Sequence, residues 1–359
     1  MSDGTTPVVG EQERLIGLDL VRLLAAFGVV VIHCGDKIGL AEVFGEALRR
    51  CCVPYFLAAA AFLLVREILE FGGPPRIGRR LRRLLVPYAL WSLIYVGARL
   101  AKWSILGRSV GQTPLSGQFW EILLLGRAAV HLYFLPMLAV GLAIGAWLTP
   151  FLRWLEGHLL WIPWLMGAAF FLYDFCVSLP FPNGLGSAAL NCSRLLISAI
   201  LFLPWLFTGV LLRVLVDPGG QMAGSRTSPW IAPVGMVLFV ILDLPGVAAF
   251  EIAESIHSWM LGECLLVIAL TLPANWAMRS RVTPWLSYAF GVYLVHHLVI
   301  MMLSGLAEAL RIPWPKVLGL PGLVGVTFVG IVGSLAAVAV MRRWSMTRRW
   351  LLGEEGPRR

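Results

Sequence analysis

The sequence predicts an all-α fold: a polytopic transmembrane helix bundle of about ten spans in one domain. Hydrophobic residues make up 58% of the chain and charged residues only 14%. The mean hydropathy is +0.80, which lies far from the value of a soluble globular domain. The apolar residues are also gathered into runs of membrane length with arginines between them. Together these observations indicate an integral membrane protein.

Ten apolar runs are long enough to cross a bilayer. In order, they are 16–34, 51–71, 84–101, 131–149, 158–177, 195–216, 229–245, 257–273, 284–304 and 317–341. The seventh run is weakened by Pro233, Asp243 and Pro245, and the eighth contains Glu263. The weakly apolar stretch 116–127 is expected to lie along the outer interface as an amphipathic helix.

The positions of the basic residues predict which way the chain enters the membrane. If the N-terminus is cytoplasmic, most of the arginines fall in inner segments, which predicts both termini inside. The domains are then a cytoplasmic segment 1–15, a membrane domain 16–341 and a basic cytoplasmic tail 342–359. Arg66 lies within a span and is expected to pair with Glu70 on its own helix. The net charge of +9 comes mainly from arginines that lie between the apolar runs, as membrane topology predicts. Nucleic acid is therefore not an expected partner.

The first apolar run contains the most informative pair of residues. Arg22 and His33 are eleven residues apart, so they lie on nearly one helical face, about 16 Å apart along the axis. Ionisable groups inside a membrane are costly and mark functional sites. The alternative is structural: Arg22 pairs with Asp19 at the interface, and His33 only caps the outer end of the helix.

An arginine-rich inner loop precedes the third span. It holds five arginines within eight residues, which are Arg76, Arg79, Arg80, Arg82 and Arg83. Such a cluster orients a membrane protein and attracts anionic lipid. Guanidinium groups also bind phosphates bidentately. Both interpretations stay open, since one cluster can serve both purposes.

Histidines and tyrosines in two further segments fall at a similar depth. His131 and Tyr133 open the fourth span, and the segment 284–297 contains Ser287, Tyr293, His296 and His297. With His33, four of the six histidines are predicted at mid-depth or toward the outer face. Each alone is more often an ordinary buried histidine, but together they indicate a polar site.

No metal site is expected from the histidines and cysteines. The adjacent His296 and His297 should point to different sides of a helix, and no HExxH pattern occurs. The six cysteines show neither CxxC pairs nor Cys/His metal spacing and are interpreted as small apolar residues; they are Cys34, Cys51, Cys52, Cys176, Cys192 and Cys264.

These features resemble the acyltransferase-3 family of integral-membrane acyltransferases over nearly the whole chain. The most specific match is an arginine, ten residues and a histidine in the first helix, here Arg22 and His33. The arginine segment running into Pro87-Tyr88, the His131-Leu-Tyr-Phe-Leu segment and the Ser287 to His296 segment match more loosely. Tyr133 stands where the family usually has tryptophan.

The resemblance implies transfer of an acyl group, usually acetyl, from cytoplasmic acyl-CoA to a hydroxyl on a carbohydrate, often at the outer face. His33 is then the expected general base, and Arg22 binds the donor or stabilises transition-state charge. The loop arginines would hold the CoA phosphates. The acceptor side is expected to involve His131, Tyr133, Ser287, Tyr293 and His296.

The expected partners are acetyl-CoA or another acyl-CoA, a carbohydrate, glycolipid or glycoside acceptor, the lipid bilayer and proteins of glycan assembly. The expected location is a bacterial cytoplasmic membrane. A fused SGNH-type domain, which some family members carry, is not expected. Acetyl or succinyl transfer, and direct attack or an acyl-histidine intermediate, stay open. The alternative function is a secondary transporter or flippase for sugars or lipid-linked sugars, although no inverted repeat is visible.

Overall fold

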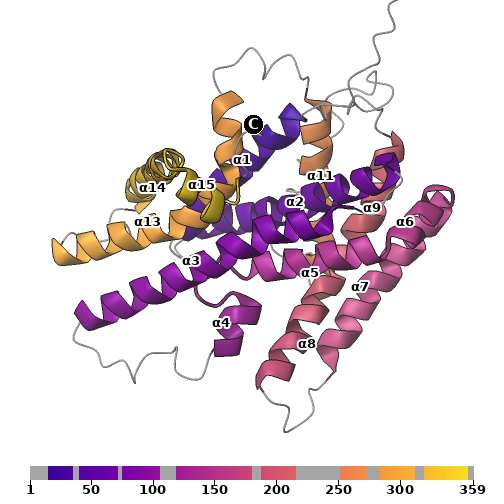
Figure 1. The fold of residues 1–359 in the computed structure, drawn as a ribbon, viewed down its shortest axis with the longest axis horizontal. Coiled ribbons are helices and arrows are strands. Elements are labelled where there is room, and N and C mark those ends of the chain that lie inside the picture. The colour runs from indigo at the N-terminus through magenta and orange to yellow at the C-terminus, as the bar shows by residue number, and fades with distance from the viewer. Residues whose placement is uncertain are drawn as a thin grey trace, which may run out of the picture.

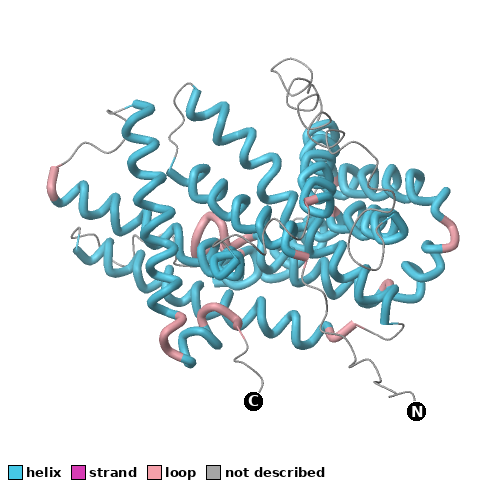
Figure 2. The backbone as a smooth tube through the Cα atoms, turned by 90° about the horizontal axis from the view of Figure 1, so that it is seen from above, coloured by secondary structure: helices cyan, strands magenta, loops and turns pink. Residues whose placement is uncertain are grey.

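The computed structural model describes residues 15–34, 40–71, 75–105, 119–179, 187–215, 251–272, 283–311 and 319–354. Within these ranges every regular element is a helix, and short loops join neighbouring helices (Figures 1 and 2). The all-α prediction is therefore confirmed.

The elements follow one another in a helical bundle (Figure 1). They are α1 (Ile16–Cys34), α2 (Leu40–Phe71), α3 (Ile77–Ile105), α4 (Phe119–Leu125), α5 (Phe134–Trp147), α6 (Thr149–Glu156), η2 (Leu159–Trp161), α7 (Ile162–Ser178), α8 (Ser187–Ile200), α9 (Phe202–Leu215), α11 (Glu251–Thr271), η3 (Thr283–Tyr288), α13 (Ala289–Ala309), α14 (Gly319–Met341) and α15 (Ser345–Trp350).

Among the described residues, seven helices are long and apolar enough to cross a membrane, or eight if the bent pair α5 and α6 forms one span. A shorter apolar helix, Ser255–Thr271, corresponds to the predicted run 257–273. The predicted span 229–245 lies outside the described residues. The membrane-bundle architecture is confirmed, while the count of ten spans and the orientation of the termini stay predictions.

The predicted span 131–149 is not one straight helix. Helix α5 covers only Phe134–Trp147, and α6 follows it at an angle of 66°. Pro150 lies in the first turn of α6, where its missing N–H is tolerated, whereas inside a continuous helix its ring would clash with the preceding turn. At the other end, the segment 131–133 lies in a turn before α5.

The central helix of the bundle is α2, which packs against α1, α5, α6, α9 and α11. Its buried face includes Tyr55 and Phe62, both 0% exposed. The Tyr55 hydroxyl donates to the Leu18 carbonyl oxygen at 2.8 Å and so fixes α2 against α1. Because α1 also contacts α13 and α14, this pair of helices connects the two halves of the described chain.

Charged residues gather where α2 ends and α3 begins. The predicted pair is confirmed: Arg66 Nε donates to Glu70 Oε1 at 2.7 Å. Glu70 also pairs with Arg213 of α9 at 3.4 Å, and Glu67 pairs with Arg80 of α3. We call this end of the bundle the arginine end.

The described part of the predicted tail folds back onto the arginine end. Trp91 Nε1 donates to the Leu351 carbonyl at 3.0 Å, and Arg83 Nε donates to the Gly353 carbonyl at the same distance. Arg342 Nε donates to Glu354 Oε1 at 2.9 Å. Residues 342–354 therefore cover part of α3 instead of extending away from the membrane domain.

Close packing of α1 against α11 requires glycine at position 17. A Cβ atom there would lie 2.2 Å from the Ala269 carbonyl oxygen and 2.9 Å from Leu272 Cβ, so the two helices would have to separate.

We predict that Gly17→Ala lowers the free energy of unfolding by about 1–3 kcal/mol, measured by denaturation in detergent. Gly97→Ala on α3, where a Cβ meets nothing within 4 Å, should change it by less than about 1 kcal/mol. Equal stability of the two variants would contradict this packing.

Candidate active site

Four histidines from three separate segments form a cluster inside the bundle. His33 comes from α1, His131 from the turn before α5, and His296 and His297 from α13. The closest ring centroids, those of His131 and His296, are 4.6 Å apart, and the farthest, those of His296 and His297, are 6.3 Å apart. The structure thus brings together the four histidines that the sequence placed in one layer.

The two adjacent histidines both belong to the cluster, although they point in different directions from α13. His33 lies 5.2 Å from His296 and 5.6 Å from His297, measured between ring centroids. Neighbouring positions on a helix differ by about 100°, and His33 and His131 occupy the space between the two directions. His297, which the sequence placed in the histidine layer without a catalytic or acceptor role, therefore belongs to the cluster as well.

The cluster leaves buried ring nitrogens without partners. Within the described residues, neither His296 Nε2 nor His297 Nδ1 makes a hydrogen bond, and His296 is 0% exposed. Buried polar atoms are nearly always paired, so these two nitrogens are available to a water molecule or a ligand. No group of three or more His, Cys, Asp or Glu side chains in the described ranges is arranged to hold a metal ion.

Two tyrosine hydroxyls fix the backbone around the histidines. Tyr293 donates to the backbone carbonyl of His131 and so joins α13 to the turn before α5. Tyr95 of α3 donates to the Leu294 carbonyl at 2.8 Å and accepts from the Leu298 amide at 3.1 Å. An α-helix normally joins that amide and carbonyl directly. The Tyr95 hydroxyl therefore enters the backbone ladder of α13 at the level of the histidines.

Glycine determines the turn that carries His131. Gly126 has a φ of +66°, a backbone conformation that favours glycine. A Cβ atom there would lie 2.5 Å from the Leu132 carbonyl carbon. The turn is closed by Leu132 N donating to the Ala129 carbonyl at 3.0 Å. This compact turn points the His131 side chain into the bundle, where it is 3% exposed.

Arg22 lies away from the histidines, toward the arginine end. Its Nη1 atom is 3.5 Å from Asp19 Oδ1, so the pair expected in the structural alternative is present. Arg22 also repels Arg80 electrostatically. Because Arg22 and His33 are eleven positions apart on the helix, about 16 Å along the axis, the two cannot contact one reacting group.

The loop arginines divide into one that faces α2 and others that face outward. Arg80 pairs with Glu67 and donates to the Leu63 carbonyl at 3.3 Å. Arg83 is exposed, with its Nε bound to the tail. The remaining three are also exposed: Arg76, Arg79 and Arg82.

Comparison with known proteins identifies the family of this chain. The sequence model of one family, described as an acyltransferase domain, matches residues 15–339, nearly the whole chain. The chain belongs to the acyltransferase-3 family. No curated protein and no solved structure shows a significant match. With its apolar helices, this makes the chain an integral, multi-pass membrane acyltransferase.

Two residues expected at the acceptor site of this acyltransferase lie elsewhere than the histidine cluster. Ser287 is exposed in η3, and its carbonyl accepts from Arg342 Nη2 at 3.3 Å, which places it beside the tail. The family resemblance groups Ser287 and His296 in one motif. The segment 284–297 runs from the arginine end to the histidine cluster, so the two residues lie apart. Tyr133 is 48% exposed and lines cavities next to the cluster.

Sequence reasoning also missed Tyr95. Its ring centroid lies 5.3 Å from that of His131 and 5.9 Å from that of His297. It is one of seven tyrosines, and neither its neighbours nor its spacing distinguishes it. Only its hydrogen bonds to the backbone of α13 place it beside the histidine cluster.

The Tyr293 hydrogen bond supplies a test of how the cluster is held together. We predict that Tyr293→Phe leaves the His131 carbonyl unpaired, lowers the free energy of unfolding by about 1–2 kcal/mol and reduces acyl transfer more than tenfold by displacing His131. Thermal denaturation and turnover measure the two effects. Tyr288→Phe is the control, because it keeps the ring that Arg342 covers at 4.1 Å. Unchanged turnover in Tyr293→Phe would show that His131 needs no such support.

Proposed function

We propose that this acyltransferase moves an acyl group, most simply acetyl, from an acyl-CoA to a hydroxyl of a carbohydrate or glycoconjugate. The observation that carries the proposal is the position of the histidine cluster. The cluster lies about 16 Å along α1 from Arg22 and the arginine end, which is suited to a polyphosphorylated donor. On its other side, the turn that carries His131 also carries Tyr133, which lines a polar, aromatic-lined cavity at the opposite end of the helices. One substrate can thus approach from each end.

The donor half of the proposal rests on the arginines. Arginine binds phosphate oxygens bidentately, and Arg79, Arg82 and Arg83 are exposed on the first turns of α3. In this arrangement they hold the CoA phosphates, while the pantetheine arm runs along α1 from Arg22 toward His33. The separation of Arg22 from His33 favours donor binding over transition-state stabilisation as the role of Arg22.

The chemical step is assigned to the histidine cluster. His33 accepts the proton of the acceptor hydroxyl as its oxygen attacks the thioester carbonyl carbon. The new C–O bond forms, the C–S bond breaks, and the proton passes from the imidazolium to the CoA sulfur. The products are an acyl ester and free CoA. His131, His296 and His297 surround His33 and provide further sites for the proton.

The proposed location is the bacterial cytoplasmic membrane, with both termini inside. The arginine end then faces the cytoplasm, in keeping with the preference of basic residues for that side, and acyl-CoA is available there. The acceptor is proposed to arrive at the outer face, supplied by proteins of glycan assembly.

Replacing the proposed base gives the most direct test of the chemistry. We expect His33→Ala to lower turnover by about 10²–10⁴-fold, the usual contribution of a general base, while membrane insertion and stability persist. The assay follows release of free CoA from acetyl-CoA by purified protein in vesicles with a glycan extract. Succinyl-CoA is run in parallel, so that the choice of acyl group does not decide the outcome. Wild-type turnover by His33→Ala would eliminate this assignment.

Replacing an arginine tests donor binding separately. We predict that Arg83→Gln raises KM for acyl-CoA at least tenfold, since a charge-assisted phosphate contact is worth roughly 1.5–3 kcal/mol, with little effect on kcat. The matched control is Arg343→Gln, which removes an exposed arginine from the segment between α14 and α15. Steady-state kinetics distinguishes the two variants. An equal KM for both would indicate that the arginines of α3 serve topology alone.

A further inference from the structure

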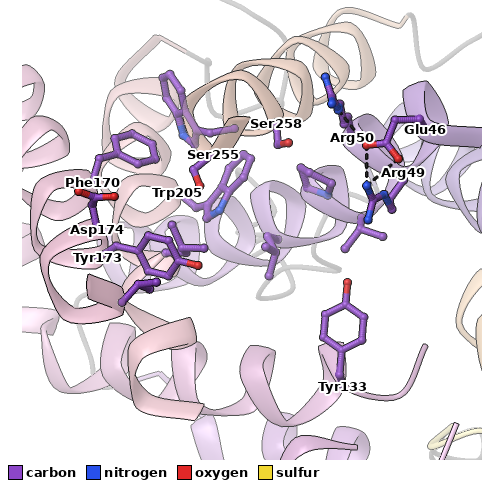
Figure 3. A pocket seen from close by; sticks show the side chains of 16 residues that line it. Glu46, Arg49, Arg50, Tyr133, Phe170, Tyr173, Asp174, Trp205, Ser255 and Ser258 are labelled. Carbon is purple, nitrogen blue, oxygen red and sulfur yellow. Dashed lines mark hydrogen bonds and ion pairs between the residues drawn. The ribbon is translucent and has the colours of Figure 1, made fainter. Parts of the chain in front are cut away.

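A cavity of about 440 Å³ lies between α2, α7, α9 and α11, with Tyr133 at its edge (Figure 3). Small-molecule sites usually measure roughly 300–1,000 Å³, so the space suits a ligand of one or two rings. None of the predicted site residues except Tyr133 lines it. The lining of the cavity is therefore a set of side chains distinct from the histidine cluster.

The cavity lies away from the arginine end. Glu46 and Arg49 occupy the first part of α2, whereas Glu67 and Glu70 of the arginine end occupy its last turns. Asp174 comes from the last turns of α7, and Trp259 from the first half of α11. These positions place the cavity at the end of the helices opposite to the proposed donor site.

The cavity adjoins the histidine cluster through the turn before α5. Tyr133 lines the cavity, and His131, two residues earlier in the same turn, belongs to the cluster. Figure 3 shows the Tyr133 hydroxyl directed toward Arg49 and the cavity. A ligand in the cavity is thus separated from the imidazoles by this short turn and the start of α5.

The charges in the cavity cancel. Glu46 accepts from Arg49 Nη2 at 2.6 Å and from Arg50 Nε at 3.0 Å, and all three line the space (Figure 3). Asp174 is the second carboxylate among the lining residues. Two arginines and two carboxylates together carry no net charge, which favours an uncharged ligand over an anionic or cationic one.

Aromatic rings supply the apolar part of the lining. The Trp259 ring lies 6.3 Å from Trp205 and 6.1 Å from Phe170, measured between centroids, and Tyr173 faces the same space. Trp259 Nε1 is buried and has no hydrogen-bond acceptor within the described residues. Flat aromatic faces beside carboxylate, guanidinium and serine groups suit a ring with an apolar face and several hydroxyls.

We propose that this cavity binds an uncharged glycosyl unit of the acyl acceptor. The proposal rests on the proposed function for the word acceptor, but binding itself requires no acyl transfer. Trp259 and Tyr173 contact the faces of the sugar ring, and Asp174 accepts hydrogen bonds from its hydroxyls. A second cavity of about 660 Å³ shares Tyr133 and Tyr173 with the first, which leaves space for the next unit of a longer glycan.

The test measures binding of neutral sugars without any acyl-CoA. Purified protein is titrated with methyl hexosides of the gluco, galacto and manno series and with the matching methyl hexuronides, and intrinsic tryptophan fluorescence reports occupancy beside Trp205 and Trp259. We expect at least one hexoside to bind more tightly than its hexuronide. Absence of binding by every hexoside, or tighter binding of the hexuronides, would overturn the proposal.

Three variants locate the binding. Tyr173→Leu should weaken hexoside binding about tenfold, whereas Phe171→Leu, a neighbour on α7 that is 69% exposed and outside the lining, should not. Asp174→Asn removes one negative charge and should weaken hexoside binding while improving that of the hexuronide. Equal effects of the Tyr173 and Phe171 changes would place the sugar elsewhere and refute the assignment.

Turnover of acyl-CoA by the same preparations separates this proposal from the function on which it rests. If CoA release depends on His33 but no hexoside binds, the acceptor site is wrong and the acyl-CoA function stands. If hexosides bind as described but no acyl-CoA is consumed, the cavity assignment stands and the proposed function fails.

Discussion

The arrangement depends on holding four imidazoles together inside a membrane bundle. A bilayer supplies no water to polar groups, so each must find its partner within the protein. The hydroxyls of Tyr95 and Tyr293 bind backbone atoms of α13 and of the His131 turn, and this fixes three segments around His33. Within the described residues, His296 Nε2 and His297 Nδ1 have no hydrogen-bond partner, and in our proposal they face the substrate.

The two ends of the helices differ in the charge of the side chains that they carry. Arg22 and His33 share α1, and that helix connects the arginine end to the cluster over about 16 Å. The tail, bound to Arg83 and Trp91, covers part of the proposed donor end. At the opposite end the charges of Glu46, Arg49, Arg50 and Asp174 cancel around aromatic rings. In our proposal, an anionic donor and a neutral acceptor therefore meet at the histidines from opposite ends.

Much of the fold follows from hydrophobic runs, because a bilayer demands long apolar helices, and the common depth of the histidines follows from their place along those runs. Depth does not specify which way a side chain faces. The inward direction of His297 and the contribution of Tyr95 depend on how α1 and α3 pack against α13. The bend before Pro150 depends on local sterics that average hydropathy conceals. The acceptor cavity draws on four helices distant in sequence, so no single segment predicts it.

The most direct test of the central claim is a structure with bound acetonyl-CoA, a thioether ketone that imitates acetyl-CoA but cannot transfer its acyl group. The account predicts the phosphates against the arginines of α3, the pantetheine arm along α1, and the ketone carbonyl in contact with His33 inside the histidine cluster. A ketone held at the arginine end beside Ser287, with the cluster unaltered and out of reach, would contradict the account.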